Sequence, residues 1–100
     1  MLLLDEPTAS LDLRHQFDLI ETTRRCAARG TTVIAILHDL NLAALFADRV
    51  VVLHRGIVAG DGPPRETITD DMLASVFNVD AAVGRAPPAG VPFVLPHAMR

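Results

Sequence analysis

Residues 1–12 read MLLLDEPTASLD, and this stretch decides the fold. It is an apolar run that ends in two adjacent acids and continues into a short polar loop. Continuous apolar runs are typical of parallel strands that are covered on both faces, and open α/β sheets bind ligands beside the carboxyl ends of their strands. The stretch therefore predicts a buried strand at residues 1–4, with Asp5 and Glu6 at a ligand-binding edge.

The elements that follow are a crossover helix and a second strand. Apolar residues recur at helical spacing over residues 13–28, where Asp12 is placed to cap the helix and Gly30 to end it. A second apolar run covers residues 32–37. The predicted fold class is α/β, with parallel strands joined by an amphipathic crossover helix.

The next segment predicts a change from parallel to antiparallel structure. A short helix is expected over residues 40–47. Two apolar segments, residues 49–54 and 57–59, flank Arg55 and Gly56. This pattern predicts a hairpin with a tight turn.

The last third of the chain predicts a helix and a tail. Residues 60–64 form a breaker, and Thr69 is placed to cap a helix that runs to about Phe77. We expect a short strand over residues 79–83. Prolines interrupt the rest of the tail, where an edge strand or an extended arm is expected over residues 91–95.

Composition excludes some classes of function. The 100 residues carry a formal net charge of −3, which argues against a nucleic-acid binder, since such proteins present a basic surface. All the basic residues are Arg, so the Lys of a phosphate-binding Walker A loop is absent. No apolar run approaches the roughly 20 residues of a membrane span. The lone Cys26 is typical of a reducing compartment, and we expect a cytoplasmic protein without a nucleic-acid partner.

Asp5 and Glu6 are the residue types that Mg-nucleotide chemistry requires. Carboxylate oxygens suit Mg²⁺, here through its water shell, and a neighbouring carboxylate can accept a proton from an attacking water. We assign the Mg²⁺ site to Asp5 and the general base to Glu6. Taken alone, the two acids also fit a simpler interpretation, the start of a solvated loop.

As a whole, residues 1–12 resemble the Walker B strand and D-loop of ABC-type ATPases. The resemblance implies that Ser10 and Asp12 lie in a loop that crosses a dimer interface and couples two ATP sites. Turn formation and helix capping are compatible roles for the same residues. Residues 36–40, Ile-Leu-His-Asp-Leu, resemble the H-loop of this family, which implies that His38 contacts the γ-phosphate. A purely structural histidine is the alternative.

The resemblance continues along the chain. Residues 47–56 and the Gly-Pro-Pro break at 62–64 resemble the hairpin region of importer ATPases. Residues 76–85 and 91–96 resemble the C-terminal extension of haem importer ATPases, within the siderophore, haem and cobalamin group. The family implies ATP and Mg²⁺ as ligands. Its implied partners are a second copy of the ATPase subunit, an integral membrane permease that holds the cytoplasmic subunit at the inner face of the cell membrane and, indirectly, a periplasmic or surface binding protein.

The same resemblance predicts the extent of the domain. Residues 1–64 are expected to be the C-terminal half of an ABC ATPase core, a P-loop NTPase fold, and residues 65–100 a C-terminal helix and extension. The sequence contains no Walker A loop, Q-loop or Leu-Ser-Gly-Gly signature. We expect a fragment of a longer reading frame, from a truncated or misplaced start, that is inactive on its own.

Two other interpretations remain open. The ATPase heads of DNA-repair and chromosome-structure proteins share the Asp-Glu-Pro-Thr string, but they place long coiled coils before the strand and lack the importer-type hairpin and tail. The other alternative is a non-catalytic fragment that serves only in interactions. His15, His54 and His97 do not have metal-ligand spacing and are interpreted as surface or turn histidines.

Overall fold

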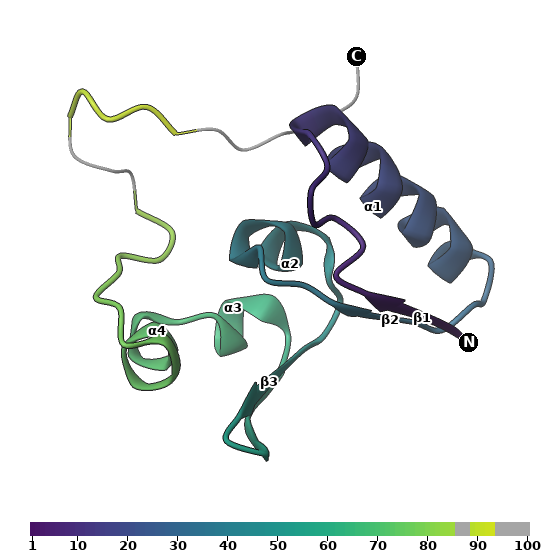
Figure 1. The fold of residues 1–100 in the computed structure, drawn as a ribbon. Coiled ribbons are helices and arrows are strands. Elements are labelled where there is room, and N and C mark those ends of the chain that lie inside the picture. The colour runs from purple at the N-terminus through teal and green to yellow at the C-terminus, as the bar shows by residue number, and fades with distance from the viewer. Residues whose placement is uncertain (86–88, 94–100) are drawn as a thin grey trace. The chain divides into compact units, whose positions relative to one another are not determined.

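The computed structural model describes residues 1–85 and 89–93. They fall into two compact units, Met1–Asp39 and Leu40–Phe93. The elements in chain order are β1 (Leu2–Asp5), α1 (Leu13–Ala28), β2 (Val33–Ile36), α2 (Leu40–Phe46), β3 (Val50–His54), β4 (Ile57–Gly62), α3 (Pro64–Thr67) and α4 (Asp70–Phe77) (Figure 1). This order confirms the α/β class and the predicted strand, helix and strand at the start.

The first unit is a parallel strand pair with a crossover helix. Leu2 pairs with Val33 and Asp5 with Ile36, so β1 and β2 end at the same edge. Helix α1 lies along this pair (Figure 1) and buries Phe17 and Ile20. The unit therefore presents the two residues that follow the strands, Glu6 and Leu37, side by side.

Local sequence sets both ends of α1. Asp12 has an extended backbone, and its Oδ1 accepts a hydrogen bond of 2.9 Å from the amide of His15. Gly30 has a φ of +95°, in the left-handed region that ends many helices. The predicted cap and the predicted stop are both confirmed.

Only one face of the β1–β2 pair is covered in the described residues. Leu2, Leu4 and Val33 are half-buried. Side chains alternate between the two faces of a strand, and the opposite face carries Leu3 and Ile34, which are 64% and 51% exposed. The expectation of strands covered on both faces is therefore not met within the part of the chain that the structure describes.

The second unit contains an antiparallel hairpin with the predicted turn. Arg55 and Gly56 have φ values of +53° and +79°, as a two-residue type I′ turn requires. Strand β4 continues to Gly62, which pairs with Val50. The prediction of a breaker from residue 60 onward is therefore wrong over its first three residues.

Close packing accounts for the glycine inside β4. A Cβ on Gly60 would lie 3.2 Å from Cγ2 of Thr67 on α3. The absent side chain therefore lets α3 approach the hairpin, which a reading of glycine as a strand breaker does not anticipate.

The core of the second unit forms between the hairpin and α4. Its buried residues are Val52, Ile68, Met72 and Leu73. Oγ1 of Thr69 accepts a hydrogen bond of 3.1 Å from the amide of Met72, which confirms the predicted cap of α4. Burial of these side chains, together with the cap, fixes α4 against the hairpin.

The segment after α4 is irregular. Residues 79–83 form no strand, so that prediction is wrong. The carboxylate of Asp70 binds this segment instead: Oδ1 accepts a hydrogen bond of 2.7 Å from the amide of Val83, and Oδ2 pairs with the guanidinium of Arg85. A side chain thus takes the amide that a neighbouring strand would need. The expected strand at 91–95 extends beyond the described residues, and His97 lies outside them.

Candidate functional site

Two polar side chains meet where β1 and β2 end. Glu6 follows β1, and its amide donates a hydrogen bond of 2.9 Å to the carbonyl oxygen of Ile36. His38 follows β2 by two residues, and its Nε2 lies 2.5 Å from Oε1 of Glu6. The His38 and Glu6 side chains are 76% and 45% exposed. The structure thus brings together the two residues predicted to be catalytic and leaves both open to a ligand from solvent.

The loop after Glu6 is folded into two consecutive turns. The amide of Ala9 donates to the carbonyl oxygen of Glu6 at 3.1 Å, and that of Leu11 donates to Thr8 at 3.3 Å. Glu6 and Ser10 have φ values of +49° and +64°. Each such left-handed residue other than glycine costs about 1–2 kcal/mol. The loop therefore holds a specific shape only because its surroundings maintain it.

A surface cavity of about 190 Å³ lies at this edge of the sheet. Its lining comes from the two strand ends, the loop and the first turn of α1, namely Glu6, Thr8, Ala9, Ser10, Gln16, His38 and Asp39. Its position beside the carboxyl ends of parallel strands is where α/β folds bind ligands. Asp5, the predicted Mg²⁺ residue, is the last residue of β1 and does not line this cavity.

Ser10 and Asp12 have different positions in the loop. Ser10 lines the cavity, whereas Asp12 caps α1. The backbone hydrogen bond from His15 holds the pKa of the Asp12 carboxyl below its ordinary value, and the imidazole of His15, 2.8 Å away through Nδ1, adds to this effect. Asp12 therefore acts as a helix cap, and its carboxylate is bound by His15 of the same chain.

Four residues that line the cavity were not assigned to the site from the sequence, namely Thr8, Ala9, Gln16 and Asp39. Asp39 lines it directly after His38, and Gln16 lines it from α1. Nε2 of Gln16 donates a hydrogen bond of 3.3 Å to the carbonyl oxygen of Thr8. The available signal was helical spacing: Gln16 lies one turn after the cap residue Asp12, on the side of α1 from which the loop arrives.

The donor set at this edge fits Mg²⁺ that is shared with a phosphate ligand. Among the described residues, no three His, Cys, Asp or Glu side chains are arranged to hold a metal ion by themselves. Mg²⁺ typically keeps several waters and takes one or two protein carboxylates together with substrate phosphates. Asp5, the residue predicted for this role, offers one such carboxylate at the end of β1. His15 lies in the first turn of α1, and His54 is the last residue of β3.

Comparison with known proteins gives close relatives over the whole chain. No protein-family model matches it. The hemin import ATP-binding protein HmuV of Rhodopseudomonas palustris (strain BisA53) is 60% identical over 100 residues. The same-named proteins of Bradyrhizobium diazoefficiens and Agrobacterium fabrum are 60% identical over 100 residues and 52% identical over 96 residues. The chain spans 37% of the length of each of these relatives.

A solved structure shares the fold. It is an inward-facing conformation of a metal-chelate type ABC transporter, with a TM-score of 0.68 and 25% sequence identity. The match covers 78% of this chain and 31% of that chain. Among the described residues, no helix has both the length and the apolar character that crossing a membrane requires. The chain therefore has the fold of part of an ABC ATPase, and its sequence matches hemin import ATP-binding proteins over its whole length.

Proposed function

We propose that this stretch is the Walker B, D-loop and H-loop part of the ATP-hydrolysing subunit of an ABC importer. The observation that carries the proposal is the contact between Glu6 and His38, which lie 2.5 Å apart at the ends of two paired parallel strands. A carboxylate and an imidazole at one sheet edge suit a water on one side and a phosphate on the other. The cargo of the assembled transporter is haem or a related iron complex, on the support of the hemin import relatives.

Each residue of the site has a role in this proposal. Glu6 orients the attacking water and accepts its proton. Glu6 holds the His38 ring through Nε2, and the ring contacts the γ-phosphate when ATP is bound. Asp5 supplies a carboxylate to Mg²⁺, and the ion, when bound, neutralises charge on the phosphates of ATP. The Walker A loop that binds those phosphates belongs to the rest of the subunit.

The partners follow from the loop and from the relatives. The exposed stretch Ala9–Leu11 is available to a second ATPase subunit, and the position of Ser10 at the cavity supports an interface beside it. The subunit works in the cytoplasm, held at the inner face of the membrane by an integral permease. A periplasmic or surface binding protein delivers the cargo to the permease. Residues 1–64 belong to the ATPase core, and residues 65–100 form its C-terminal helix and extension.

A substitution in the intact subunit tests the proposal. Glu6→Gln keeps the size of the side chain but cannot accept a proton, so steady-state hydrolysis should fall at least about 100-fold. Binding of Mg-ATP should remain, and the variant should accumulate as an ATP-bound dimer. Both are measured by phosphate release and by nucleotide-dependent gel filtration.

Glu21→Gln is the matched control, because it makes the same chemical change on α1 away from the cavity. Its hydrolysis should equal that of the parent. Hydrolysis by Glu6→Gln at near the parent's rate would remove Glu6 from the catalytic role and, with it, the proposed function of the site.

A further inference from the structure

We propose that Gln16 positions the loop between Glu6 and Ser10 for hydrolysis by holding the carbonyl oxygen of Thr8. The inference rests on the proposed function, because it concerns how this chain keeps Glu6 and Ser10 in place beside the cavity. Gln16 acts through the loop and is therefore a positioning residue.

The contact joins a rigid helix to the middle of the loop. Nε2 of Gln16 donates to the carbonyl oxygen of Thr8 at 3.3 Å across eight residues of sequence. Thr8 is buried, with 6% of its surface exposed, and the same carbonyl oxygen accepts the amide of Leu11. Gln16 belongs to the first turn of α1, which Asp12 caps. The side chain of Gln16 therefore starts from a capped helix, and its Nε2 gives the carbonyl oxygen of buried Thr8 a second hydrogen bond.

The backbone of this loop needs such a support. Glu6 and Ser10 lie on either side of Thr8, and both have left-handed φ values. Residues in such conformations persist only where the surrounding structure holds them. The amide of Glu6 is anchored to β2 through Ile36 at one end. The bond from Gln16 supplies a second anchor, on the Ser10 side.

The position of Gln16 links this support to the site. Its side chain lines the same cavity as Glu6, Ser10 and His38. An amide neither gains nor loses a proton in the relevant pH range, so Gln16 is not a proton acceptor. What it offers is a hydrogen-bond donor to the loop and an apolar stem, and substitutions can separate these two contributions.

The test uses the intact subunit with two variants. Gln16→Met keeps the length and the stem but removes the donor, while Gln16→Glu replaces the donor with a carboxylate oxygen that faces a carbonyl oxygen. Both should lower kcat by roughly tenfold to a hundredfold, as expected for a misplaced catalytic group. KM for ATP and the unfolding temperature should stay near those of the parent, because nucleotide affinity comes from the phosphate-binding loop.

The pH profile adds a readout that a packing role would not move. A protonated glutamic acid can again donate to Thr8. The kcat of Gln16→Glu relative to the parent should therefore rise as pH falls from about 8 to about 5.5, toward the ordinary range of a Glu carboxyl. The same ratio for Gln16→Met should stay flat. Asp18→Asn, on the exposed side of α1, is the control and should match the parent.

Three results would overturn the inference. They are a parental kcat in Gln16→Met, a flat pH ratio in Gln16→Glu, and a fall in kcat that only follows a loss of folded protein. Absence of hydrolysis in the parent and in Asp18→Asn would instead overturn the proposed function, and the inference with it. Because the parent is measured in the same series, the two failures are distinguishable.

Discussion

Nε2 of His38 lies 2.5 Å from Oε1 of Glu6, although the two residues are 32 positions apart in the sequence. The parallel register of β1 and β2 creates this contact, because Asp5 pairs with Ile36 and both strands end at one edge. The predicted proton acceptor and the predicted phosphate-contacting group therefore form one hydrogen-bonded unit. A change in either residue is expected to alter the environment of the other.

His38→Ala in the intact subunit should lower the rate of ATP hydrolysis by at least about 100-fold. The ring is 76% exposed, so its loss removes little packing and the unfolding temperature should change little. Phosphate release and thermal unfolding measure the two effects. His54→Ala, at the hairpin turn, is the control and should keep the parental rate. Equal rates and equal stability for His38→Ala and the parent would return His38 to a structural role.

Asp5→Asn should change the response to Mg²⁺ as well as the rate. The amide keeps an oxygen but loses the charge that favours a divalent cation. We expect the Mg²⁺ concentration for half-maximal hydrolysis to rise by about tenfold or more, since losses of this order accompany weakened metal sites. A titration of activity with Mg²⁺ at saturating ATP measures the change. An unaltered Mg²⁺ dependence would contradict the assignment of Asp5.

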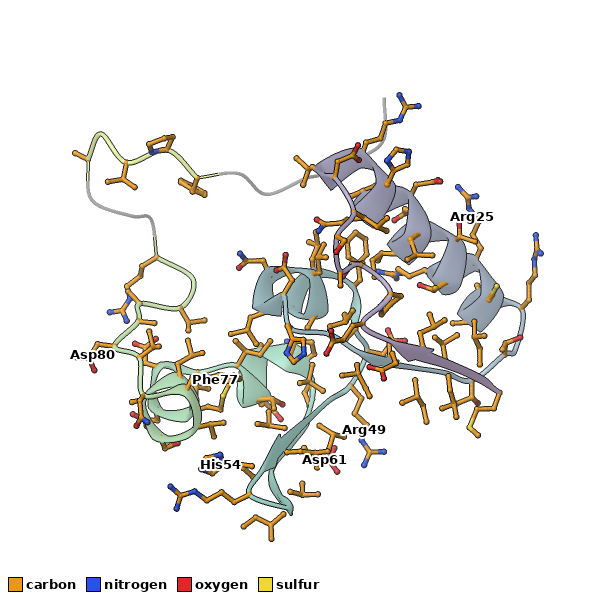
Figure 2. The ribbon with its side chains drawn as sticks, in the orientation of Figure 1. Arg25, Arg49, His54, Asp61, Phe77 and Asp80 are labelled. Atoms are coloured by element: carbon orange, nitrogen blue, oxygen red, sulfur yellow. The ribbon has the colours of Figure 1, made fainter. Side chains whose placement is uncertain are left out.

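The ion pair of Arg49 and Asp61 should make hairpin stability depend on acid pH. Nε and Nη2 of Arg49 donate to Oδ1 and Oδ2 of Asp61, each at 2.6 Å, and the two side chains lie side by side in Figure 2. These hydrogen bonds hold the pKa of the Asp61 carboxyl below its ordinary value. A carboxyl with a lowered pKa stabilises the fold above its unfolded pKa of about 3.9 and loses that contribution as pH falls through the folded value.

Asp61→Asn should therefore lower the unfolding temperature of the intact subunit slightly at pH near 7. The difference from the parent should shrink as pH is lowered below about 4. Asp80→Asn, an exposed carboxylate after α4, controls for the loss of one charge and should show a smaller difference at neutral pH. A difference for Asp61→Asn that stays constant down to acid pH would argue against the pair as its source.

Expressed alone, the 100-residue chain should neither hydrolyse ATP nor bind it tightly. It contains no Lys, so no Walker A loop can form, and Glu6 and His38 then have no phosphate to act on. The open face of β1 and β2, with Leu3, Ile34 and Ile36 exposed, favours association over a stable monomer. Calorimetric titration with Mg-ATP and thermal unfolding test this prediction. Micromolar binding by a monomer that melts cooperatively would contradict it.

Local signals account for the parts of the fold that were predictable from sequence. Asp12 and Gly30 gave both ends of α1, and Thr69 gave the start of α4, because caps and stops act within one turn of the residue that causes them. The turn at Arg55 and Gly56 was equally local. The site edge followed from the apolar strand and its two acids, since the carboxyl ends of parallel strands come together.

The features that sequence did not give depend on contacts between distant residues. Gly60 lies inside β4, where its missing side chain leaves room for Thr67, and the amide of Val83 is bound by Asp70 instead of by a neighbouring strand. Neither contact leaves a periodic pattern in the sequence. The bond from Gln16 to Thr8 was missed for a related reason: it depends on the path of a loop whose left-handed residues are not glycines.

The backbone at Glu6 and Ser10 also has a consequence for protein engineering. Glycine adopts a φ of +49° or +64° without the steric cost that other residues bear, so Glu6→Gly would relieve about 1 kcal/mol of strain. The same substitution would remove the carboxylate that meets His38. A library screened only for heat resistance would therefore enrich inactive subunits at this position, and stabilisation of the protein should be sought at residues outside this loop.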